Sequence, residues 1–336
     1  MAAPSVVVWP NGTHCDRVGS LRQRNVGAVS RRRRAVRVGP PLPLRGPVAE
    51  LHPHAILNPL NLTAYQPVAE PRGLACVGAR QGEVMTIFTR SDDLQGAQFV
   101  DANLRGARFV RAELSGVVMR AVDVQGADID APWLFDGESY LRVNGVDVIP
   151  LVEAELNRRF PGRADRRAAD PDALRAAWAT LERTWAATHE RVAAMPAGTV
   201  NVSVDGEWSF AQTVRHLVMA TDTWLGRAIL EIEQPFHPIG QPNVEYATDG
   251  NDMSIFTTVT PPYADVLEVR AGRVAMMRDF LAAVTPDDLA ETRKNPWAPE
   301  YPETILSCLH TILGEEWEHH RYAVRDLDAI EATSDA

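Results

Sequence analysis

The sequence predicts a mainly α-helical protein whose C-terminal half is a four-helix bundle. Apolar residues recur at helical spacing in four long segments, which indicates a buried stripe on each helix. Proline, glycine and capping residues separate these segments, as expected where helices start and stop. Hydrophobic residues make up 45% of the chain and charged residues 23%, values that are ordinary for a globular protein.

We expect the four helices at about residues 171–195, 209–231, 264–284 and 303–330. Asp170 is a plausible N-cap for the first, and the Thr-Pro-Asp-Asp sequence at 285–288 stops the third. The second and third are joined by about thirty residues rich in Pro, Gly, Asn and Thr. Such long connections are usually functional, so we expect this loop to form part of a site.

The rest of the chain divides by composition into three parts before the bundle at 170–330. Residues 1–84 are rich in Pro, Gly and Arg, keep no helical or strand period and are expected to be disordered. We expect translation to begin at Met85, so that this leader is not natively made. Residues 85–131 form a repeat segment, and residues 132–169 form a connector with one short helix at about 150–160.

Charge and cysteine usage exclude several classes of protein. Residues 1–84 carry 11 arginines against 4 acidic residues and are therefore basic. Since the whole chain has a formal net charge of −10, the remaining residues are strongly acidic. An acidic body does not suit nucleic acid. No run of 18 apolar residues predicts a membrane span. Cys15, Cys76 and Cys308 are far apart, which argues against disulfides and thiolate metal sites. We expect a cytoplasmic protein without nucleic-acid or membrane partners, and a homodimer is compatible with the sequence.

A large apolar residue recurs every five positions between residues 94 and 129, a period that fits neither helix nor strand. The eight positions are Leu94, Phe99, Leu104, Phe109, Leu114, Met119, Val124 and Ile129. Most follow a small residue by two positions, a pattern that resembles the pentapeptide-repeat family. The resemblance implies a right-handed β-helix of about two coils, with the large residues pointing inward. We interpret it as a short structural cap docked on the bundle, in preference to the DNA mimicry of longer members.

The last helix carries ionisable residues inside its apolar stripe. Glu316 and His320 are four residues apart, so their side chains share one face. Burying either without a partner would cost several kcal/mol, so both need one. The neighbouring pair, Glu315 and His319, lies near Tyr322 on what looks like the solvent face. The periodicity therefore favours Glu316 and His320 as the functional pair.

His216 on the second helix is the third candidate ligand. A lone histidine on an apolar face is usually a satisfied core residue, but a Glu-x-x-x-His pair on another helix reverses that expectation. His216, Glu316 and His320 would give three protein ligands and leave one coordination position open, as in catalytic zinc sites. Zinc is the favoured divalent metal, and nickel, iron or manganese also fit. No further catalytic residue is assigned.

The segment at 207–217 and the Glu-Glu-Trp-Glu-His-His run at 315–320 resemble the DinB/YfiT-like superfamily of metal-binding four-helix bundles. The resemblance covers about residues 170–330 and places one ligand on the second helix and two on the last. Glu316 departs from the common three-histidine form. It matches the His/Glu/His set of the mycothiol-dependent maleylpyruvate isomerase relatives.

The resemblance implies a metal-dependent enzyme that activates a low-molecular-weight thiol, such as mycothiol, for S-transfer or isomerisation on a small electrophile. A metal-dependent hydrolase and a non-catalytic metal-stabilised sensor or assembly module remain alternatives. Arg215 and Arg325 are candidates for binding an anionic substrate. Other residues are interpreted as structural: His189, His237, His310, Trp208, Trp224, Trp317 and Cys308.

Overall fold

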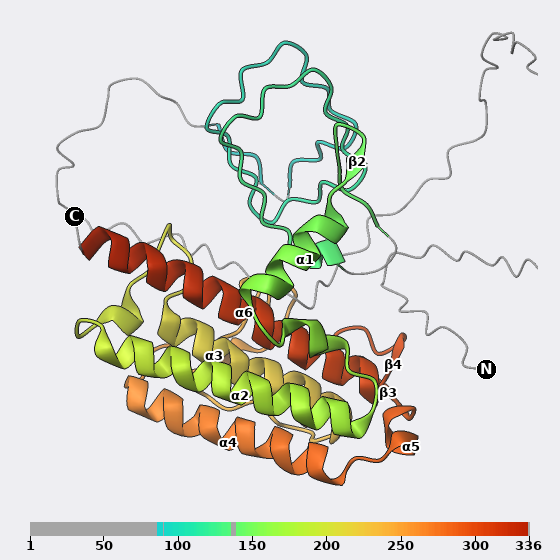
Figure 1. The fold of residues 1–336 in the computed structure, drawn as a ribbon, viewed down its shortest axis with the longest axis vertical. Coiled ribbons are helices and arrows are strands. Elements are labelled where there is room, and N and C mark those ends of the chain that lie inside the picture. The colour runs from blue at the N-terminus through green and yellow to red at the C-terminus, as the bar shows by residue number, and fades with distance from the viewer. Residues whose placement is uncertain (1–85, 90, 136–138, 335–336) are drawn as a thin grey trace, which may run out of the picture.

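The computed structural model describes residues 86–89, 91–135 and 139–334. The predicted leader at 1–84 and the expected start at Met85 lie outside the described residues. The described chain is mainly helical. Four long helices dominate it (Figure 1): α2 (Pro171–Ala194), α3 (Phe210–Thr221), α4 (Tyr263–Ala283) and α6 (Ile305–Ser334). Helices α4 and α6 each contact both α2 and α3, so the four helices surround a common interior.

The helices begin where the sequence offers caps. The Asp170 side chain accepts a hydrogen bond from the Ala173 amide, and Pro171 occupies the first turn of α2. Helix α3 starts with a capping box, in which Ser209 and Gln212 satisfy each other's backbone amides. It then continues as a π-helical segment, η4 (Asp222–Ile229). The predicted second helix is therefore present, with a change of winding near its middle.

The interior is apolar and draws on all four helices. Trp178, Leu217, Met277 and Leu309 are each at most 3% exposed. Burying a large apolar side chain stabilises the fold by about 1.5–3 kcal/mol. This core holds the four helices together and brings α3 against α6.

The connection between η4 and α4 lies along α3 and is held there by its own side chains. Phe236, Tyr246 and Phe256 form an aromatic cluster with Met219 of α3. The Gln241 amide donates a hydrogen bond to the carbonyl of residue 215 on α3, at 3.1 Å. The loop therefore places backbone groups beside the ionisable residues of α3.

The remaining elements are short. Two antiparallel pairs of strands are formed by β1 (Arg142–Val143) with β2 (Val146–Asp147) and by β3 (Thr292–Lys294) with β4 (Pro302–Thr304). Helix α1 (Ile149–Arg159) lies where the connector helix was predicted. The other short elements precede or connect the long helices: η1 (Pro132–Phe135), η2 (Arg163–Arg167), η3 (Thr199–Asn201), η5 (Met253–Ile255) and α5 (Pro286–Leu289).

The repeat segment winds into a ring on the far side of α1 from the four helices (Figure 1). A turn recurs every ten residues, with Gly96, Gly106, Gly116 and Gly126 all at φ between 74° and 77°. Contrary to prediction, the eight central apolar side chains are not buried in a packed interior, because each is 44–63% exposed. Residues 91–131 form turns and no strand, so there is no ladder to stack one coil on the next.

Across the described part of the chain, no helix has the length and apolarity needed to cross a membrane.

Candidate metal centre

Three ionisable side chains converge where α3 packs against α6. His216 comes from α3, and Glu315 and His319 lie one turn apart on α6. One ligand-type atom of each lies within 4.8 Å of the others. Glu315 Oε2 is 3.3 Å from His319 Nε2 and 3.7 Å from His216 Nε2. All three residues are buried, so the cluster is held inside the protein.

Two atoms of this cluster have no hydrogen-bond partner. Glu315 Oε2 and His319 Nε2 are close, but they do not meet the geometry of a hydrogen bond. A buried polar atom left unpaired costs about 1–3 kcal/mol. Two such atoms side by side, one from a carboxylate and one from an imidazole, are the donor types that a divalent cation accepts. The residues present therefore fit a metal ion.

The ring of His216 is oriented by the loop and covered by an indole. Its Nδ1 lies 2.9 Å from the carbonyl oxygen of Gln241. A carbonyl can only accept, so Nδ1 carries a proton, and Nε2 is the ring nitrogen that lies towards Glu315. The Trp208 ring packs on His216, with ring centroids 4.7 Å apart, and stacks on His319 at 6.0 Å. Trp208 thus shields both imidazoles from water.

The surroundings shift the pKa values of two members of the cluster, His319 and Glu315. Burial lowers the pKa of His319 to about 4, so its imidazole is neutral. Burial raises the pKa of the Glu315 carboxyl, but the adjacent imidazoles of His216 and His319 together lower it by more. The net result is a pKa below the usual value for glutamate. Glu315 is therefore a carboxylate, and the cluster offers nitrogen and oxygen donors together.

The predicted grouping of His216 with Glu316 and His320 is not found. Glu316 turns to α4, where its Oε1 accepts a 2.5 Å hydrogen bond from Arg270 Nη2. His320 turns to α2, where its Nε2 lies 2.9 Å from the Thr188 hydroxyl. The partners of His216 are the pair one position earlier on α6. The apolar periodicity of α6 could not distinguish the two Glu-x-x-x-His pairs, because the helix is buried on every side here. Each residue from 315 to 320 is at most 5% exposed.

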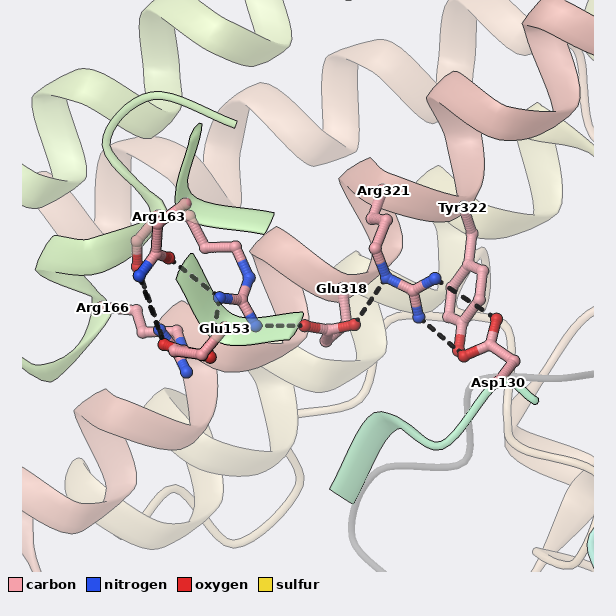
Figure 2. A network of polar contacts seen from close by, with 8 residues as sticks. Asp130, Glu153, Arg163, Arg166, Glu318, Arg321 and Tyr322 are labelled. Atoms are coloured by element: carbon pink, nitrogen blue, oxygen red, sulfur yellow. Dashed lines mark hydrogen bonds and ion pairs between the residues drawn. The ribbon is translucent and has the colours of Figure 1, made fainter. Parts of the chain in front are cut away.

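The face of α6 expected to be solvated is covered by residues that precede the four helices in the chain. Tyr322 is buried, and its hydroxyl donates a 2.9 Å hydrogen bond to Asp130. Figure 2 shows the ionic network that continues from there. Arg321 bridges Asp130 and Glu318, and Glu318 pairs with Arg163 of η2 at 3.3 Å. The outer side of α6 therefore packs against Asp130 and η2 rather than water.

The two arginines predicted to bind substrate have partners within the protein. Arg215 is buried and donates from Nε to the carbonyl of Ile239, at 2.7 Å. Arg325 forms ion pairs with Glu207 and Asp326. Their role in substrate binding stays a prediction.

The histidines interpreted as structural have partners outside the cluster. His310 Nε2 lies 2.8 Å from the Ala168 carbonyl, and His189 Nδ1 lies 3.0 Å from the Tyr263 hydroxyl. The Ile239 amide donates to the ring of His237.

Cys308 is fully buried among apolar side chains. Burial raises the pKa of its thiol to about 12, so the sulfur stays protonated at neutral pH. The interpretation of Cys308 as a small buried apolar residue is confirmed.

The described chain is mainly helical, and its His216/Glu315/His319 cluster could hold a metal ion. Residues 180–323 match the model of the DinB superfamily. Residues 93–130 match the model of pentapeptide repeats, in eight copies. The predicted resemblance to both families is confirmed. No curated protein and no solved structure matches the chain.

Proposed function

We propose that His216, Glu315 and His319 bind a divalent metal ion and that the chain is a metal-dependent enzyme. The observation that carries the proposal is the buried convergence of these three side chains, with one oxygen and one nitrogen left unpaired. Membership of residues 180–323 in the DinB superfamily, whose members typically bind metals, supports it.

Two imidazoles and one carboxylate are three protein ligands, the number typical of catalytic zinc sites with an open position. Zinc is the favoured ion, and nickel, iron or manganese suit the same donors. When bound, the cation would act as a Lewis acid that lowers the pKa of a thiol or water in the remaining position. Gln241 would hold His216 in the ligating tautomer, and Trp208 would limit access of bulk water.

The substrate class that we favour is a low-molecular-weight thiol such as mycothiol, together with a small electrophile. The His/Glu/His donor set, on Glu315 and His319 rather than Glu316 and His320, matches the thiol-dependent relatives in the DinB resemblance. The thiol would lose its proton to solvent, and its sulfur would form a bond to the electrophilic carbon while the bond from that carbon to its leaving group, such as chloride, breaks and the leaving group departs to solvent. Residues 230–262, which contribute the Gln241 carbonyl, would line the entrance.

We also propose that α2, α3, α4 and α6 form a DinB-type four-helix bundle and that residues 92–130 wind as right-handed coils of the pentapeptide type. The contacts of α4 and α6 with both other helices support the first proposal. The turn that recurs every ten residues supports the second.

A matched set of variants tests the metal site. We expect Glu315→Gln and His319→Gln to lose at least tenfold in zinc affinity, because each removes a ligand. The neighbouring variant His320→Gln should retain zinc within a few-fold, because that side chain contacts Thr188 on α2. Competition with a chromophoric zinc chelator measures all three. The opposite ranking would move the site to the predicted pair, and retention of zinc by His216→Ala would remove it altogether.

A conjugation assay tests the reaction. We expect the zinc-loaded protein to join mycothiol to 1-chloro-2,4-dinitrobenzene, forming a carbon–sulfur bond and releasing chloride, with His319→Gln inactive. The absorbance of the conjugate reports the rate. Turnover of ester substrates without any thiol would favour the hydrolase, and bound zinc without turnover of either kind would favour the non-catalytic module.

A further inference from the structure

Helix α6 makes polar contacts with three different helices within six residues. Glu315 and His319 face α3, Glu316 faces Arg270 on α4, and His320 faces Thr188 on α2. Successive residues of an α-helix are about 100° apart around its axis. The rotation of α6 therefore decides which Glu-x-x-x-His pair lies opposite His216.

The contact between Arg270 and Glu316 is the strongest of these constraints. Both side chains are at most 7% exposed, and Nη2 lies 2.5 Å from Oε1. The other terminal atoms, Arg270 Nη1 and Glu316 Oε2, have no hydrogen-bond partner. Each charge therefore depends on the other for its compensation inside the protein, where an unpaired charge is strongly unfavourable.

A rotation of α6 by one residue would bring Glu316 and His320 towards α3 and His216. The same rotation would carry Glu316 away from α4 and leave Arg270 buried without its counter-charge. Residues 315–320 are buried on every side of the helix, so burial at these positions does not by itself choose between the two Glu-x-x-x-His pairs. A directional charge pair is what distinguishes the two rotations.

We propose that the Arg270–Glu316 ion pair is a positioning device: it fixes the rotation of α6 so that Glu315 and His319, and not Glu316 and His320, face His216. Arg270 is thus a positioning residue for the metal centre, although it contributes no ligand. This inference rests on the proposed metal site.

The test is the binding of Co²⁺ to the full-length protein, followed by visible absorption, because the cobalt spectrum reports both affinity and ligand geometry. We expect Arg270→Leu to bind Co²⁺ at least tenfold more weakly and with a changed absorption band. Partners that orient ligands usually affect metal affinity by this order.

Arg273→Leu is the matched control. Arg273 lies one turn further along α4 and forms an ion pair with buried Asp222 at 2.6 Å, at the end of α3 rather than on α6. Its loss also breaks a buried ion pair, but that pair includes no residue of α6. The rotation of α6 should therefore stay as in the wild type. We expect Arg273→Leu to keep the wild-type cobalt band and an affinity within about twofold of wild type.

The double variant Arg270→Leu/Glu316→Leu keeps the test decisive if Arg270→Leu does not fold, because it buries no charge. We expect it to fold and still to bind Co²⁺ several-fold more weakly, with a changed band. A wild-type band and affinity in the double variant, or an equal loss in Arg273→Leu, would overturn the positioning role alone. Wild-type protein that binds no Co²⁺, or His216→Ala that binds it equally, would overturn the metal site itself and this inference with it.

Discussion

At the scale of single residues, Gly162 shows how tightly the connector is set against the helices. It has a φ of 97°, a conformation that side chains rarely adopt. A Cβ added there would lie 2.5 Å from Thr180 Cγ2 on α2 and 3.3 Å from Trp317 Cζ2 on α6. The close approach and the backbone conformation both require glycine, at the point where the chain enters η2.

We expect Gly162→Ala to lower the free energy of unfolding by about 2–4 kcal/mol, from backbone strain and overpacking together. Gly198→Ala is the control, because Gly198 has a φ of 93° but nothing within 4 Å of an added Cβ. It should lose only about 1 kcal/mol. Urea unfolding followed by circular dichroism measures both, and equal losses would show that the contact with α2 is not tight.

At the scale of elements, helices with one apolar face were predictable and the rotation of α6 was not. The apolar stripes and caps place α2 and α4 within a few residues of their observed bounds. Around Glu315 the same reasoning fails, because Asp130 and Trp208 cover the face that the sequence pattern leaves to solvent.

Two parts of the candidate site had no signal in the sequence. The group that orients His216 is the backbone carbonyl of Gln241, and any residue type could supply it. The network of Figure 2 joins Glu318 to Arg163, which lies 155 residues earlier in the chain. Only the folded arrangement of η2 against α6 brings such partners together, so charge patterning along the sequence does not predict them.

At the scale of the whole molecule, the buried histidines make stability depend on pH. Burial is the first cause that lowers the pKa of His189, His319 and His320, each to about 4. An unfolded histidine has a pKa of about 6.5. The unfolded chain therefore binds protons first as the pH falls, and the folded state loses stability between about pH 6.5 and pH 4. Above pH 7 these residues are neutral in both states and contribute no pH dependence.

We expect the metal-free protein, kept so with a chelator, to be several kcal/mol less stable at pH 5 than at pH 7.5. Each fully buried histidine should account for roughly 2 kcal/mol of that difference, and half-buried His189 for less. Urea unfolding at both values measures it, with pH 7.5 against pH 8.5 as the control that should show little change. His320→Gln removes one of the three histidines and should reduce the loss of unfolding free energy at pH 5 by roughly 2 kcal/mol. A loss at pH 5 that is unchanged in His320→Gln would mean that His320 is not held neutral by burial.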